Sequence, residues 1–95
     1  MTNLPSGLVS TRRPQARTVS SDDGSVSFTL ARMPGGVLVE RVQFRGGTAR
    51  VVQTALFTDD ESFRRWCDAD TLRFDYPLLH VSLRHDGNDL FTRSA

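Results

Sequence analysis

A chain of 95 residues, of which 38% are hydrophobic and 24% charged, is long enough for one small domain with a modest core. Its single cysteine, Cys67, excludes an intrachain disulfide framework and a zinc site built from several cysteines. The formal net charge is only +1, no apolar run reaches the roughly twenty residues that span a bilayer, and the first residues lack the pattern of a signal peptide. We therefore expect a cytoplasmic protein with no membrane segment.

The basic residues point to the origin of the chain rather than to its partner. All of them are arginines, and isoleucine is absent as well. Lysine and isoleucine have AT-rich codons, so this composition is typical of a GC-rich bacterial genome. An alternative is that arginine was selected for its bidentate contacts with phosphate or carboxylate groups. We favour codon usage, and arginine content alone then gives no evidence for nucleic-acid binding.

Residues 1–24 have the composition of a disordered tail. They contain Pro5 and Pro14, many serines and threonines, and no aromatic residue. Such a segment buries too little apolar surface to offset the entropy lost on ordering, about 1–2 kcal/mol per residue. Arg12, Arg13 and Arg17 give it local positive charge. It is predicted to be either a frayed terminus, which we favour, or a short basic arm that contacts an acidic partner.

Three β-strands are predicted to follow. Val26, Phe28 and Leu30 alternate with small or polar residues, which indicates a strand with one buried face over residues 25–32. Turn residues at positions 33–36 separate it from a second strand at 37–45, and Gly46-Gly47 joins that strand to a third at 48–57. Tight connections of this kind predict an antiparallel meander.

A helix is predicted over residues 58–68. The sequence Thr58-Asp59-Asp60-Glu61 matches the capping box, and its acidic residues suit the positive end of the helix dipole. Phe63, Trp66 and Cys67 then form one apolar stripe.

The last third of the chain is compatible with two structures. Asp75 and Pro77 favour a second helix over about 75–86, with Gly87 just beyond its end and a short strand at 89–93. Alternating apolar residues from Leu79 to Leu83 and the turn signal Asp86-Gly87 instead favour a strand. We prefer the helix.

Together these elements predict a two-layer α+β domain over residues 25–95. A three- to four-stranded antiparallel meander sheet would pack against one or two helices on one face. The expected core combines the inward residues of the strands with those of the helices: Val26, Phe28, Leu30, Leu38, Val42, Phe44, Val51, Ala55, Phe57, Phe63, Trp66, Cys67, Leu79 and Leu83.

No arrangement of residues indicates catalysis, a metal site or a cofactor. Cys67 lies on the apolar stripe of the first helix, where a thiol stays protonated. His80 and His85 are five positions apart, so they share neither a helix face nor a strand face. The acidic residues match no metal-binding motif, and the glycine pairs connect strands rather than preceding a helix that could receive a phosphate. We therefore expect that this protein is not an enzyme and that it binds neither a metal ion nor a cofactor.

Two features suggest binding instead. Val37, Val39, Val52 and Leu56 do not fit a single buried face together with the rest of the strands, which leaves apolar surface for a partner. Residues 25–57 carry four arginines and one glutamate, whereas residues 58–95 carry eight acidic residues and five arginines. Such a bipolar chain either neutralises itself internally or attracts a partner or a second copy.

The function expected from the sequence is that of a non-enzymatic protein-interaction domain. Its partner would be another protein or a second copy of the chain. The alternative is weak nucleic-acid binding by an arginine patch on the second hairpin, together with the basic tail: Arg41, Arg45, Arg50, Arg12, Arg13 and Arg17. Near-neutral net charge and the lack of interleaved exposed aromatic residues make this alternative the weaker one.

Overall fold

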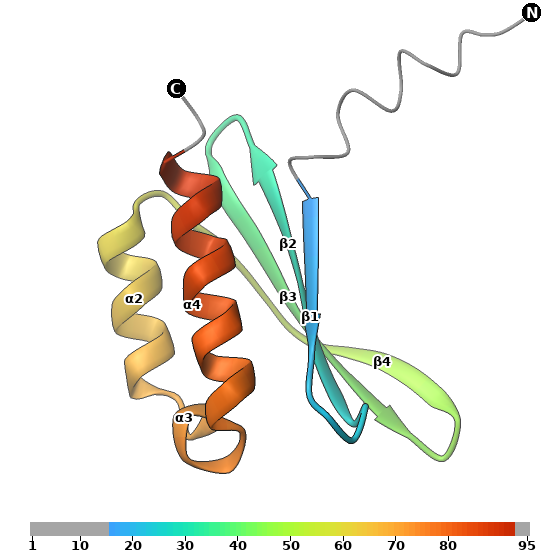
Figure 1. Ribbon diagram of the computed structural model, residues 1–95. Coiled ribbons are helices and arrows are strands. Elements are labelled where there is room, and N and C mark those ends of the chain that lie inside the picture. Colours follow the sequence, from blue (N-terminus) through green and yellow to red (C-terminus); the bar gives the residue numbers. More distant parts are fainter. Residues whose placement is uncertain (1–15, 93–95) are drawn as a thin grey trace, which may run out of the picture.

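The computed structural model describes residues 16–92 and shows a four-stranded antiparallel sheet with helices on one face (Figure 1). The strands are β1 (Ala16–Ser20), β2 (Val26–Met33), β3 (Gly36–Arg45) and β4 (Thr48–Phe57), and they lie side by side in chain order. The helices are α2 (Asp60–Ala69), the short α3 (Leu72–Asp75) and α4 (Pro77–Thr92). This confirms the predicted α+β class and the antiparallel meander.

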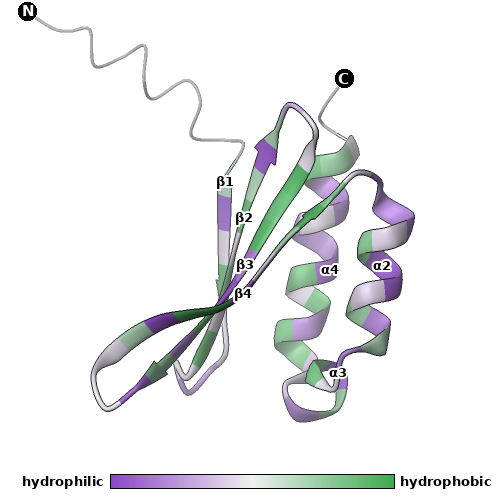
Figure 2. Cartoon of the chain, turned by 180° about the vertical axis from the view of Figure 1, so that it is seen from behind, coloured by the Kyte–Doolittle hydropathy of each residue, from purple (hydrophilic) through white to green (hydrophobic). Residues whose placement is uncertain are grey.

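The β3–β4 hairpin turns at Gly46-Gly47, as the sequence predicts. Arg45 pairs with Thr48, and the two glycines have φ angles of 58° and 80°. Positive φ at both central residues is the geometry of the primed turns that suit the twist of a hairpin. The hairpin projects beyond the helices, and hydrophobic segments recur along its strands (Figure 2).

Strand β1 corrects the predicted start of the ordered domain. We expected residues 16–24 to belong to a tail, but Ala16–Ser20 pair with Ser27–Ala31 of β2. Val19 is buried in the core, and the turn that follows is held by a backbone hydrogen bond from Ser21 to Val26. The polar composition of this segment hid the strand because, of its five residues, only Val19 is a buried apolar one. Residues 1–15 of the predicted tail lie outside the described residues.

The core lies between the sheet and the helices. It consists of Val19, Phe28, Leu30, Val37, Val39, Phe63, Cys67, Leu72, Leu79, Leu83 and Leu90. The prediction was correct for β2 and for the stripe on α2, but it chose the wrong face of β3. Leu38 and Val42 are half-buried and Phe44 is exposed, whereas Val37 and Val39 are buried. Val51, also expected in the core, is 52% exposed.

The N-cap of helix α2 lies one residue later in the chain than predicted. The N-cap is Asp59, not Thr58, and its carboxylate accepts a hydrogen bond from the backbone N–H of Ser62 at 2.8 Å. Aspartate at this position satisfies a free N–H and also suits the helix dipole. These hydrogen bonds to Ser62 lower the pKa of Asp59 below its usual value.

Helix α4 continues through the glycine at which it was predicted to end, so the short strand expected at 89–93 does not form over its described residues. Gly87 is buried, and a Cβ atom built on it would lie 2.2 Å from Cε2 of Phe63. The glycine therefore leaves room for the ring of Phe63 from α2 to lie against α4, and it is not a stop signal. Packing against Phe63 offsets the roughly 1 kcal/mol that glycine costs inside a helix.

Among residues 16–92, no helix combines the length and the apolar character needed to cross a membrane.

Candidate interaction surface

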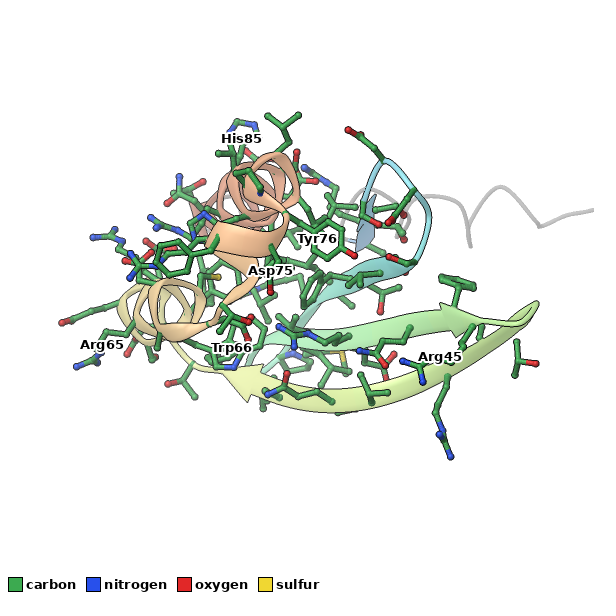
Figure 3. All side chains as sticks on the ribbon, turned by 90° about the horizontal axis from the view of Figure 1, so that it is seen from below. Arg45, Arg65, Trp66, Asp75, Tyr76 and His85 are labelled. Atoms are coloured by element: carbon green, nitrogen blue, oxygen red, sulfur yellow. The ribbon has the colours of Figure 1, made fainter. Side chains whose placement is uncertain are left out.

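The helices cover only one face of the sheet, and we call the opposite side the open face. Arg17 reaches carboxylates on α4 and Arg41 reaches Asp70 at the end of α2, so both point to the helical layer. The residues that alternate with them along β1 and β3 therefore point to the open face. Figure 3 shows both helices on one side of the sheet, with Arg65 and His85 directed away from it. An antiparallel sheet that exposes one face to water normally carries polar residues there.

Large apolar side chains occupy much of the open face. Met33, Phe44, Val51 and Leu56 are 40%, 45%, 52% and 51% exposed. The strand register places Leu38 opposite Leu56, Val42 opposite Val51, and Phe44 opposite Ala49. Paired residues of an antiparallel ladder point to the same side, so these pairs form apolar contacts across β3 and β4.

A polar row separates the apolar pairs. The register connects Thr18 to Thr29, Thr29 to Glu40, and Glu40 to Thr54, so one row crosses all four strands. The hydroxyl of Thr29 donates a hydrogen bond to Glu40 at 3.4 Å. Leu38 and Leu56 lie on one side of this row, and Val42, Val51 and Phe44 lie on the other. Glu40 is the only charged residue whose register position falls on the open face of the described strands.

The predicted arginine patch is divided by the structure. Arg41 points to the helix side, where its Nη2 lies 2.6 Å from Oδ2 of Asp70 and its guanidinium stands over the rings of Phe28 and Trp66 at 5.1 and 5.9 Å. This half-buried arginine is held by an ion pair and by cation–π contacts. It is therefore not available to follow a phosphate backbone.

Arg17 of β1 is also paired with the helical layer. Its guanidinium lies 2.5 Å from Asp89 and 3.4 Å from Asp86, both on α4. The hydrogen bond to Asp89 is the main reason that the pKa of Arg17 is raised. Part of the charge separation seen in the sequence is thus neutralised inside the molecule. Arg12 and Arg13 lie outside the described residues.

Arg45 and Arg50 remain exposed near the end of the β3–β4 hairpin. Together with Gln43, Thr48 and Ala49 they line a hollow of about 400 Å³. Within residues 16–92, no carboxylate lies within 4.0 Å of either guanidinium. Figure 3 shows Arg45 on the projecting hairpin, away from the helices. Only these two arginines of the predicted second-hairpin patch are brought together and left free of ion pairs.

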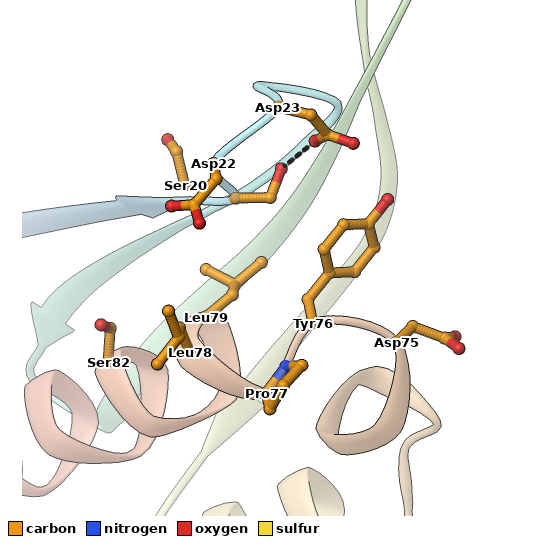
Figure 4. A pocket seen from close by; sticks show the side chains of 10 residues that line it. Ser20, Asp22, Asp23, Asp75, Tyr76, Pro77, Leu78, Leu79 and Ser82 are labelled. Atoms are coloured by element: carbon orange, nitrogen blue, oxygen red, sulfur yellow. Dashed lines mark hydrogen bonds between the residues drawn. The ribbon is translucent and has the colours of Figure 1, made fainter.

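A second hollow, of about 380 Å³, lies between the β1–β2 turn and the start of α4 (Figure 4). Its lining residues are Ser20, Ser21, Asp22, Asp23, Asp75, Tyr76, Pro77, Leu78, Leu79 and Ser82. Asp23 accepts hydrogen bonds from the backbone and hydroxyl of Ser25 and from the hydroxyl of Ser21, and these bonds lower its pKa to about 2. A carboxylate so stabilised in its ionised form is a poor general base. Its role here is to hold the turn.

Nucleophilic chemistry would need a reactive thiol or hydroxyl beside a base, and the single thiol is buried. Cys67 is 1% exposed, and burial raises the pKa of its thiol to about 12. His80 lies 3.6 Å from Asp68, and His85 points away from the sheet on α4. In the described part of the chain, no three His, Cys, Asp or Glu side chains form a group that could hold a metal ion. With a pKa of about 12, the thiol of Cys67 is almost entirely protonated at neutral pH.

Comparison of the chain with protein-family models, with curated proteins and with solved structures gives no match.

Sequence reasoning identified the surplus of apolar strand residues but not the surface that they form. Val37, Val39 and Leu56 were recognised as incompatible with one buried face, and the structure divides them between the two faces of the sheet. The polar row that includes Glu40 was missed, because a row across strands depends on register. The Gly46-Gly47 turn alone would place Glu40 opposite Gln53, and it is the register shift between Arg41 and Val42 that places it opposite Thr54.

Proposed function

We propose that the chain is a non-enzymatic protein-interaction domain that binds its partner through the open face of the sheet. The observation that carries this proposal is the half exposure of Met33, Phe44, Val51 and Leu56 on a face where water-exposed strands normally carry polar residues. We retain the expectation that the protein acts in the cytoplasm as part of this proposal.

The size of the apolar surface is compatible with a specific but moderate interaction. Complete burial of one such side chain stabilises by about 1.5–3 kcal/mol, so four half-exposed side chains would contribute roughly 3–6 kcal/mol when covered. Association costs about 4–15 kcal/mol in lost motion and ordering. Contacts from Leu38, Val42 and the polar row must therefore add to these four, and we expect a dissociation constant in the micromolar range or weaker.

A non-catalytic role agrees with the chemistry of the described residues. Cys67 is buried and its thiol is held protonated, and Asp23 is committed to the β1–β2 turn. Other carboxylates form ion pairs that support the fold, between elements as Asp70 does with Arg41, or along α2 as Asp60 does with Arg64.

A photo-crosslinking experiment tests the proposal. A photoreactive amino acid replaces Leu56 on the open face in one variant and Val81, 62% exposed on α4, in the other. After irradiation in bacterial cells, we expect discrete protein adducts from position 56 and only background from position 81. Equal labelling from both positions would contradict binding through the open face.

Nucleic-acid binding is the second candidate, favoured by the two exposed arginines on the projecting hairpin. Arg45 and Arg50 would contact phosphates, and the described ion pairs leave both guanidinium groups free to do so. An amide NMR titration with a random-sequence oligonucleotide tests this role. Shifts confined to residues 43–50 and suppressed by salt would support it, since phosphate contacts release counterions. An unchanged spectrum at low salt would reject it.

A further inference from the structure

From the arrangement of side chains on the open face, we propose that its partner is a second copy of this chain. The two copies would pack face to face across a two-fold axis that runs parallel to the strands, between β3 and β4. This inference rests on the proposed interaction function and deepens it by naming the occupant of the surface. It also specifies which residues meet across the interface.

The strand register makes the surface self-complementary about this axis. A two-fold rotation about a line between β3 and β4 places β3 of one copy over β4 of the other at the same height. Within one copy the register pairs Leu38 with Leu56 and Val42 with Val51. After the rotation, Leu38 therefore faces Leu56 of the other copy, and Val42 faces Val51. Each of these four residues of β3 and β4 thus meets an apolar residue, as an isologous interface requires.

The same axis gives the single charged residue of the face a polar neighbour. Glu40 is paired with Thr54 in the β3–β4 register, so the rotation places the Glu40 carboxylate opposite the Thr54 hydroxyl of the other copy. A hydroxyl can donate a hydrogen bond to a carboxylate. Like charges do not meet, because Glu40 does not face its own equivalent.

The remaining charges of the sheet do not oppose this approach. Arg17 and Arg41 are directed to the helical layer and are paired there with carboxylates of Asp89 and Asp70. Arg32, Arg45 and Arg50 occupy register positions on the helix side of the sheet. A strongly acidic or basic partner would find one charged group on the open face, whereas a second copy presents a surface of the same near-neutral, apolar character.

The available area predicts a weak dimer rather than a permanent one. Two overlapping strands of ten residues, with about 3.4 Å per residue and about 4.8 Å between strands, cover on the order of 300–500 Å² per copy once the flanking side chains are included. Stable complexes bury about 800 Å² per partner. Association should therefore depend on protein concentration, with Thr18 of β1 and Ser27 and Thr29 of β2 beside the apolar contacts.

Pairing of two copies along the free edge of β4 is less compatible with the structure. The register of β3 and β4 shifts between Arg41 and Val42, which leaves Val52 as the extra residue of a β-bulge. Bulges twist an edge strand away from a straight ladder and hinder pairing with another chain.

Sedimentation equilibrium of the full-length chain over a wide concentration range tests the proposal. We expect the mass to rise from 10.6 kDa towards twice that value as concentration increases. Leu56→Glu should raise the dissociation constant at least tenfold, whereas Val81→Glu, at an exposed apolar site on α4, should leave it unchanged. Circular dichroism confirms that both variants are folded. A dimer that tolerates Leu56→Glu, or one that Val81→Glu disrupts, overturns the assignment to the open face.

A charge-pair experiment tests the orientation separately. Leu38→Arg and Leu56→Glu should each be monomeric, and an equimolar mixture should recover dimers, because Arg at 38 in one copy then faces Glu at 56 in the other while the second contact stays native. Failure of the mixture to recover dimers overturns the proposed axis. If the wild-type chain stays monomeric throughout but position 56 still crosslinks to a foreign protein, the second copy is rejected and the interaction function stands. If crosslinking fails as well, both are rejected.

Discussion

Replacement of Gly87 by alanine is predicted to destabilise the protein, although alanine is the better helix former. Position 87 lies inside α4, where alanine would ordinarily stabilise by about 0.5–1 kcal/mol. Here a Cβ atom would lie 2.2 Å from Cε2 and 2.4 Å from Cζ of Phe63. Both distances are far shorter than the optimal carbon–carbon separation of about 3.5–4.0 Å.

The ring of Phe63 has little room to move away from the added methyl group. Phe63 is completely buried, and its ring centroid lies 5.5 Å from that of Phe57, 6.1 Å from that of Phe91 and 6.3 Å from that of Trp66. An added methyl group must therefore shift several rings or separate α4 from α2. Overpacking of this kind costs about 1–3 kcal/mol. After the gain in helix propensity is subtracted, we expect a net loss of about 1–2 kcal/mol.

Urea unfolding followed by the fluorescence of Trp66 measures this loss. Asn88→Ala, at the exposed next position of the same helix, serves as the control for helix propensity and should be neutral or slightly stabilising. In a Phe63→Leu background, the smaller side chain makes room for the methyl group, so Gly87→Ala should cost much less than in the wild type. If Gly87→Ala stabilises the protein as much as Asn88→Ala does, the close approach of α2 and α4 is refuted.

Three further predictions concern single side chains. Cys67, buried and with its pKa raised to about 12, should react with iodoacetamide at pH 8 far more slowly in the native protein than in urea, and rapid native labelling would contradict its burial. Arg41→Ala should lower the free energy of unfolding by about 1–3 kcal/mol, because it removes an ion pair with Asp70 and a cation–π contact with Phe28. A thermal melt that matches that of the wild type would show that these contacts do not stabilise the protein. Asp23 has its pKa lowered from 3.8 to about 2 by serine hydrogen bonds, so its contribution is complete above pH 4 and is lost as the pH falls through 2. Asp23→Asn should accordingly be less stable than the wild type in urea at pH 7, and the difference should shrink as the pH is lowered from 4 through 2. A difference that stays constant over this range would argue against this ionisation.

The parts of the fold that the sequence predicts correctly depend on patterns of neighbouring residues. The alternation of Val26, Phe28 and Leu30 and the Gly46-Gly47 turn depend only on residues close in sequence, and both were interpreted correctly. Strand β1 and the full length of α4 depend on distant partners instead. Arg17 is fixed by carboxylates about seventy positions away on α4, and Gly87 is tolerated in the helix because Phe63 fills the space beside it.

The candidate site was only partly predictable, for a related reason. Arg41, Arg45 and Arg50 were correctly placed on neighbouring strands, but their separation depends on Asp70, which comes from the loop after α2 and pairs with Arg41. Without the helices, nothing distinguishes Arg41 from Arg45 in the strand pattern. Only the packed structure shows that the first is committed to an ion pair and the second is not.

The wrong face chosen for β3 is itself informative about the surface. Val37 and Val39 alternate with Leu38, Val42 and Phe44, so both faces of this strand are apolar, and period-two alternation cannot decide which face is buried. A strand with apolar residues on both faces is typical of a sheet that is covered on both sides. In this molecule the helices cover one side, and the residues that misled the prediction are those left at the surface on the other. The ambiguity about which face of β3 is buried and the exposed apolar residues of the sheet therefore have one physical origin, a second apolar face on this strand. Association across that face would cover β3 on both sides, which is the environment that its sequence favours.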